Sequence, residues 1–186
     1  MKLPIFPLPV FLLPQGITRL RIFEQRYLKM VKLAIKEHGF AILSTVSGEH
    51  KGVENWASWV DIINFDQDKH GVLTIDVKCK SIVSVAELSE DKDKLKYADI
   101  VPQNHWPEER YDDVTNRLSQ SLLKIFEENN LLSDLYQSGF NDNANWIMSR
   151  WVELLPITLE EKMIFAQQNS YPMAKQFIAN IVLVEK

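Results

Sequence analysis

The sequence predicts an α+β protein, with a β-rich first part that contains one embedded helix and a helical second part. Three observations indicate this fold class. Prolines break the apolar start into extended chain, segments rich in β-branched and aromatic residues continue to about residue 101, and apolar residues then recur at helical spacing. We place the boundary after residue 102, which gives a β-rich subdomain over 1–102 and a helical subdomain over 103–186.

The opening stretch LPIFPLPVFLLP, residues 3–14, is predicted to form a rigid edge strand. Each proline fixes its own backbone angle and drives the preceding residue toward extended geometry. Pro7 and Pro9 lack amide donors on the same edge, whereas the other edge keeps the amides of Leu8 and Val10 for pairing. Because the prolines interrupt the apolar run that a signal peptide or membrane span needs, we expect a cytoplasmic protein. The single cysteine, Cys79, agrees with a reducing compartment.

The next forty residues predict a strand, a helix and another strand. Ile17–Phe23 alternates in polarity and predicts a short strand, and Phe40–Val46 predicts a second one. The segment between them has an amphipathic helical stripe formed by Tyr27, Met30, Val31, Ala34 and Ile35. Glu24 stands at the start of this helix, where negative charge is favourable, and Gly39 stands just past its end.

Three further β segments are expected at residues 56–65, 71–79 and 80–88, with a hairpin loop at DQDKHG between the first two. Apolar stripes at helical spacing then mark helices within 114–126, 144–155 and 173–181. The pattern TLEE at residues 158–161 is typical of a capping box at a helix start.

Three stretches of the sequence carry a family resemblance, and they are LPIFPLPVFLLPQG, LRIFEQRYLKMV and, at residues 154–167, LLPITLEEKMIFAQ. Together they resemble the amino-terminal, substrate-recognition domain of the Lon protease family. The resemblance implies a PUA-like pseudo-barrel with one embedded helix, followed by a helical bundle. It implies a polypeptide-binding module that stands alone, without the ATPase and peptidase domains of full Lon proteases. The motif residues to which it gives a structural role, holding the first helix against the first strand, are Pro7, Pro9, Phe23, Glu24, Arg26 and Tyr27.

No catalytic, metal or cofactor motif is recognised in the sequence. No pair of the six glycines has the spacing of a P-loop, which uses backbone amides to hold phosphates. Asp66, Asp68 and Gly71 match three positions of a calcium loop, but Val77 stands where the loop needs a bidentate carboxylate. None of the histidines is spaced as a helical metal-ligand pair; they are His38, His50, His70 and His105. We therefore expect no enzymatic activity, no metal and no cofactor.

Aromatic and aliphatic residues outside the motif are the candidates for a binding surface. In an extended strand, Trp59, Ile63 and Phe65 share one face, opposite to a face that suits a core. Trp106, between the two subdomains, is a second candidate. Exposed apolar patches with aromatic anchors can take up polypeptide. The alternative is that both tryptophans are buried.

Two functional classes follow. The first is a non-catalytic module that binds unfolded or extended polypeptide, and that could select or deliver substrates to a protease supplied by another chain. The second is a small-molecule or modified-base binding domain, or an enzyme, on the same barrel. The net charge of −4 and the absence of a basic run argue against nucleic acid. A shallow apolar groove would favour the first class, and a deep pocket with clustered carboxylates the second.

Overall fold

The computed structural model describes residues 1–45, 52–137 and 139–184. The chain separates into two compact units, residues 1–103 and 104–186. Among the described residues, the first unit contains six strands and one helix, and the second contains five helices. The predicted α+β class is confirmed. Val46, which ends the strand predicted over Phe40–Val46, lies outside the described residues, and so does His50.

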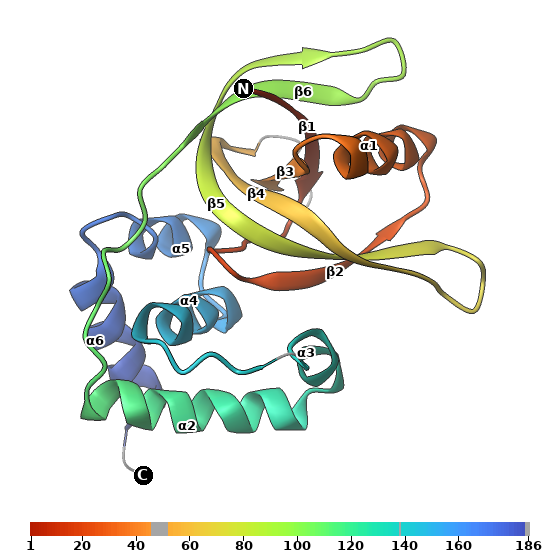
Figure 1. The fold of residues 1–186 in the computed structure, drawn as a ribbon. Coiled ribbons are helices and arrows are strands. Elements are labelled where there is room, and N and C mark those ends of the chain that lie inside the picture. Colours follow the sequence, from red (N-terminus) through yellow and green to blue (C-terminus); the bar gives the residue numbers. More distant parts are fainter. Residues whose placement is uncertain (46–51, 138, 185–186) are drawn as a thin grey trace. The chain divides into compact units, whose positions relative to one another are not determined.

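The first unit opens with two strands and its single helix, and four strands follow (Figure 1). In order these are β1 (Lys2–Leu8), β2 (Ile17–Ile22), α1 (Gln25–Lys36), β3 (Phe40–Thr45), β4 (Gly52–Gln67), β5 (Leu73–Glu90) and β6 (Lys96–Pro102). The β segments expected at 71–79 and 80–88 form one long strand, β5, whose pairing shifts register twice against β4 and once against β6. Such irregularities let a single strand bend and serve two sides of a sheet.

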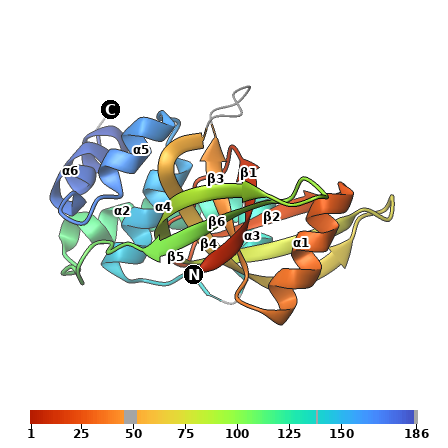
Figure 2. The same cartoon turned by 90° about the horizontal axis from the view of Figure 1, so that it is seen from above.

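Five of the strands close a near-barrel ring in the order β1, β3, β4, β5, β6. The β1–β3 pair is parallel and the other pairs are antiparallel. β5 closes the ring because its second half pairs with β6, while its first half pairs with β2. β2 therefore lies outside the ring. Figure 2 shows β1 beside β6 from above.

The opening stretch is not the edge strand that the sequence predicts, because β1 pairs with β3 on one side and with β6 on the other. Pro4 lies within the pairing with β6, opposite Tyr97, and Pro7 lies just beyond its end. The amide of Ile100 donates to the carbonyl of Met1, so odd-numbered residues of β1 direct their backbone groups toward β6. This pairing stops at Ile5, and Pro7 is the next residue that faces the same side. Leu8 pairs with Ser44 of β3 on the opposite edge. A proline at such a position prevents an incoming strand from continuing the ladder.

Alternating side chains of the sheet fill two separate clusters. The first lies between the sheet and α1 and includes Phe6, Met30 and Phe40. The second receives side chains from all five ring strands, and its members are Leu3, Ile5, Ala41, Leu43, Ala57, Val83, Val85, Ala98 and Ile100. Because neighbouring residues such as Ile5 and Phe6 point to opposite faces, both faces of β1 and β3 are buried.

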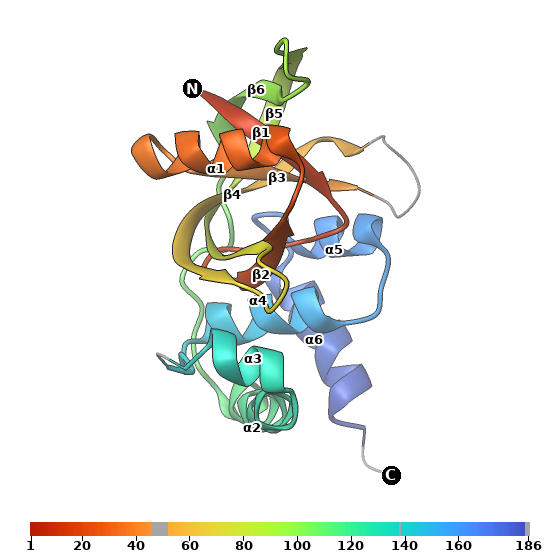
Figure 3. The same ribbon diagram turned by 90° about the vertical axis from the view of Figure 1, so that its right-hand side faces the viewer.

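The second unit consists of α2 (Asp113–Glu128), α3 (Asn130–Leu135), α4 (Ala144–Leu154), α5 (Leu159–Phe165) and α6 (Tyr171–Val182). Thr158 and Glu161 form the reciprocal hydrogen bonds of a capping box at the start of α5, as predicted. α4 is the most buried helix and contacts both α2 and α6 (Figure 3). None of the helices in the described ranges has the length and apolar character needed to cross a membrane.

Candidate functional site

Trp59 is half-buried and held by several contacts. Its indole N–H donates to the carbonyl of His38 at 2.6 Å, and the Lys80 ammonium lies 4.0 Å from the centroid of its ring. Lys80 also forms a 2.9 Å ion pair with Asp61. The indole of Trp59 packs against the second hydrophobic cluster, the one that receives side chains from all five ring strands. These contacts fasten the turn between α1 and β3 to β4 and leave little of the indole open to a partner.

Trp59, Ile63 and Phe65 do not share the face that simple alternation predicts. Ile63 is an extra residue in β4, because its neighbours Ile62 and Asn64 pair with the consecutive residues Val77 and Asp76. This bulge reverses the alternation, and Phe65 therefore pairs with the buried Ile75 on the face opposite to Trp59. Ile63 and Phe65 remain 49% and 47% exposed.

Trp106 is buried within the helical unit. Its indole N–H donates to the Ser170 hydroxyl at 3.1 Å, and its ring meets the edge of Tyr171 at a centroid distance of 5.1 Å. Of the two readings that the sequence left open, burial is the one observed for this residue. Trp106 packs the helices together and offers no surface to a partner.

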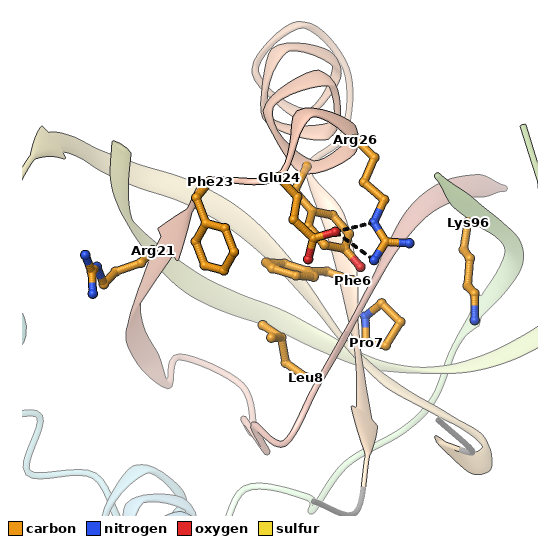
Figure 4. A pocket seen from close by; sticks show the side chains of 9 residues that line it. Phe6, Pro7, Leu8, Arg21, Phe23, Glu24, Arg26 and Lys96 are labelled. Atoms are coloured by element: carbon orange, nitrogen blue, oxygen red, sulfur yellow. Dashed lines mark hydrogen bonds and ion pairs between the residues drawn. The ribbon is translucent and has the colours of Figure 1, made fainter. Parts of the chain in front are cut away.

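Five of the six motif residues to which the resemblance gives a structural role, all except Pro9, line a pocket of about 330 Å³ (Figure 4). Residues of β1 form one wall, the junction between β2 and α1 forms another, and one residue of β6 completes the rim. The lining residues are Phe6, Pro7, Leu8, Arg21, Phe23, Glu24, Arg26, Tyr27 and Lys96. The first two of the three sequence stretches that carry the family resemblance thus come together at one place on the first unit.

The base of this pocket is aromatic and rigid. The rings of Phe6 and Tyr27 lie 4.1 Å apart, and the Arg26 guanidinium lies 4.7 Å from the centroid of Tyr27. Glu24 is the N-cap residue of α1, but its carboxylate does not cap the helix. It accepts a 2.8 Å hydrogen bond from Arg26 instead, which holds the guanidinium over the ring. Burial raises the pKa of Tyr27, so its hydroxyl stays neutral.

Phe23 is the most exposed aromatic side chain of the first unit, at 71%. It occupies the position before the N-cap of α1, where an apolar residue often packs against the fourth residue of the helix, here Leu28. The exposure of the ring shows that this packing leaves most of it uncovered. Phe23 continues the alternation of Arg19 and Arg21, opposite to the buried Leu20. That phase was the signal in the sequence that it faces outward.

Charged groups surround the apolar base. The exposed Arg21 forms a 2.7 Å ion pair with Asp68 of the β4–β5 hairpin. The pKa of Asp68 is lowered mainly because two backbone amides of that hairpin donate hydrogen bonds to its carboxylate, and Arg21 lowers it further. No salt bridge reaches Lys96 from any residue that the structure describes. Lys96 is thus the cation of the rim best placed to receive an outside carboxylate.

The donor set of the pocket suits binding rather than acid–base chemistry. Its single carboxylate, Glu24, is tied to Arg26, so no carboxylate pair is present to exchange a proton with a ligand. Within residues 1–45, 52–137 and 139–184, no group of three metal-ligating side chains is found. An apolar base with a projecting aromatic ring is instead the geometry that accepts an apolar side chain.

Comparison with known proteins gives a family match and two similar folds. A family model described as the ATP-dependent protease La (LON) substrate-binding domain matches residues 2–170. The crystal structure of a Lon N-terminal domain protein from Xanthomonas campestris has 23% identity and a TM-score of 0.69, covering 96% of this chain and 98% of that one. The N-terminal domain of a Mycobacterium avium complex Lon protease has 10% identity and a TM-score of 0.66, covering 100% of each chain. At these identities the likeness concerns the fold. The comparison with curated proteins gave no match.

Proposed function

Because residues 2–170 match its model, the chain belongs to the family of the ATP-dependent protease La (LON) substrate-binding domain, and we propose that it binds exposed segments of unfolded or extended polypeptide. The site is the pocket between β1, α1 and the end of β2. The observation that carries this proposal is Phe23, an aromatic ring 71% exposed at the rim of an apolar pocket. Large apolar side chains left open beside such a pocket are typical of interaction sites.

The pocket favours a polypeptide over a small molecule or a modified base. A volume of about 330 Å³ is near the lower limit for small-ligand sites, roughly 300 Å³. Two of its polar groups, Arg21 and Lys96, are long side chains at the rim, which are adaptable and suit variable partners. A specific small-ligand site would instead place fixed polar groups against an enclosed ligand.

The proposed activity is non-catalytic. The match covers a substrate-binding domain, and the pocket offers no nucleophile with an adjacent base. An adaptor role, in which the bound polypeptide is delivered to a protease on another chain, is one use of such binding. An adaptor must also release the bound segment or hand it over to the protease.

The test compares two variants in one binding assay. Binding of reduced, alkylated and fluorescently labelled α-lactalbumin is followed by anisotropy for the unaltered protein and for Phe23→Ser and Phe65→Ser. The two substitutions remove an exposed aromatic ring from the same unit, but only Phe23 lines the pocket. We expect Phe23→Ser to weaken binding at least tenfold, about 1.4 kcal/mol, which exceeds the loss of about 1 kcal/mol that most interface residues do not reach when truncated. Phe65→Ser should change it less than twofold.

Each other result has a definite meaning. Equal loss in both variants, or a loss in Phe65→Ser alone, would move the site away from the pocket. Absence of binding by the unaltered protein at about 100 μM would leave polypeptide capture without support, because affinities weaker than this correspond to less than roughly 5.5 kcal/mol.

A further inference from the structure

Three cationic side chains line the pocket. They come from three different elements, with Arg21 at the end of β2, Arg26 on α1 and Lys96 on β6. In Figure 4, Arg21 and Lys96 stand on opposite sides of the pocket, and Phe6 and Leu8 lie between them. A chain that crosses the apolar base would therefore meet a cation before and after the residue that enters it.

These cations differ in how firmly they are engaged. Arg26 is held by Glu24 at 2.8 Å and stacks near Tyr27, so it belongs to the base of the pocket. Arg21 pairs with Asp68, but its side chain is 61% exposed, and such surface pairs contribute little and exchange readily. Lys96 makes no salt bridge with the described residues. The chain as a whole carries a net charge of −4, so this cationic rim is a local feature.

Backbone pairing contributes little at this wall of the pocket. Pro7 faces the side of β1 beyond the end of β6 and has no amide to donate. An added strand could not continue the ladder there, so the affinity has to come from side chains. The apolar base and the charged rim are the two features that remain to distinguish one segment from another.

We propose that the pocket selects extended polypeptide segments in which one large apolar residue is flanked on both sides by acidic residues. This inference rests on the proposed function and names the class of segment that the same site prefers. The apolar side chain occupies the space between Phe6 and Phe23. The acidic side chains meet Lys96 on one side and Arg21 on the other. A segment ending in a free carboxylate would satisfy only one side.

The test uses three labelled peptides of thirteen residues in a glycine–serine background. The first has a central Phe with Asp on both sides, the second has Asn in place of both Asp residues, and the third has Ser in place of Phe. At low ionic strength we expect the Asp peptide to bind roughly fivefold more tightly than the Asn peptide, which is the effect of two exposed ion pairs. The preference should shrink at 0.5 M salt, where exposed charges are screened.

A charge-matched pair of variants locates the effect. Lys96→Gln should reduce the preference for the Asp peptide to about twofold or less, because one of its two ion pairs is lost. Lys92→Gln removes the same charge from an exposed position that does not line the pocket, and it should leave the preference unchanged. An equal effect of both variants would overturn the assignment to the rim.

The outcomes separate this inference from the proposed function. If the Asp and Asn peptides bind equally well and Phe23→Ser weakens both, polypeptide binding at the pocket stands and the acidic preference is wrong. If neither the peptides nor unfolded α-lactalbumin binds, both proposals fall.

Discussion

The ring of Phe6 on β1 lies 4.1 Å from the ring of Tyr27 on α1, with an angle of 34° between the two planes. The ring of Phe6 also lies 6.2 Å from the ring of Phe40 on β3, so the side chain of Phe6 links β1 to both α1 and β3. The rings of Phe6 and Tyr27 also form the base of the pocket. The contact that holds α1 on the sheet therefore also shapes the proposed binding site.

Replacing Phe6 by Leu should lower the free energy of unfolding by about 1–3 kcal/mol. The substitution removes the aromatic pair and leaves unfilled space where Phe6, which is only 6% exposed, was packed. Urea denaturation measures the loss. Tyr27→Phe keeps both rings and is the matched control, with an expected change below about 1 kcal/mol. A larger loss for Tyr27→Phe than for Phe6→Leu would contradict the role given to ring stacking.

Gly39 should not tolerate a side chain. Its φ of +76° lies in the left-handed region, and a Cβ there would overlap the backbone oxygen of Val60. Gly39→Ala is expected to cost about 3 kcal/mol or more, since the conformation alone costs about 1–2 kcal/mol and the overlap adds to it. Gly71 has a nearly identical φ of +78° and open space around it. Gly71→Ala isolates the conformational part, about 1 kcal/mol, and the difference between the two variants measures the overlap.

His105 makes the helical unit sensitive to acid. Burial is the main cause that lowers the pKa of this imidazole from 6.5 to about 4; Arg150 lowers it further, while the carbonyl of Ala166 opposes the shift. The unfolded chain binds a proton to His105 at a higher pH than the folded chain does. The contribution of His105 to stability is therefore complete above pH 6.5 and falls as the pH decreases toward 4, by up to about 3 kcal/mol.

The variant His105→Asn removes this titration. Its amide can still donate toward the carbonyl of Ala166, which lies 3.1 Å from His105 Nδ1. Thermal or urea unfolding between pH 7 and pH 4 should show a smaller loss of stability for the variant than for the unaltered protein. Equal pH profiles would indicate that His105 is accessible to protons in the folded state.

The local elements of this protein are predictable because their signals are local. Prolines dictate the extended start, the stripe from Tyr27 to Ile35 dictates α1, and Thr158 with Glu161 dictates the start of α5. The closure of the ring by β5 is different. It depends on register shifts in the pairing of β5 with both β4 and β6, and the bulge residue Ile63 of β4 carries no recognisable signal in the sequence.

The surface was harder to predict than the fold for the same reason. One inserted residue places Phe65 on the face opposite to Trp59, so a patch predicted from strict alternation is divided between two faces. The pocket could not be found from spacing, because Phe6 and Phe23 are brought together only by the fold. The motif residues were recognised in the sequence, but their local pattern indicated packing and gave no sign of an opening beside them.

Photo-crosslinking tests the central claim most directly. Benzoylphenylalanine is placed at position 23 in one variant and at position 65 in another, and each protein is irradiated with unfolded, labelled α-lactalbumin. The account predicts crosslinks from position 23 that decrease when the Asp-flanked Phe peptide is added in excess, and little crosslinking from position 65. Crosslinks from position 65 with none from position 23 would contradict it, because the polypeptide would then contact β4 and leave the pocket empty.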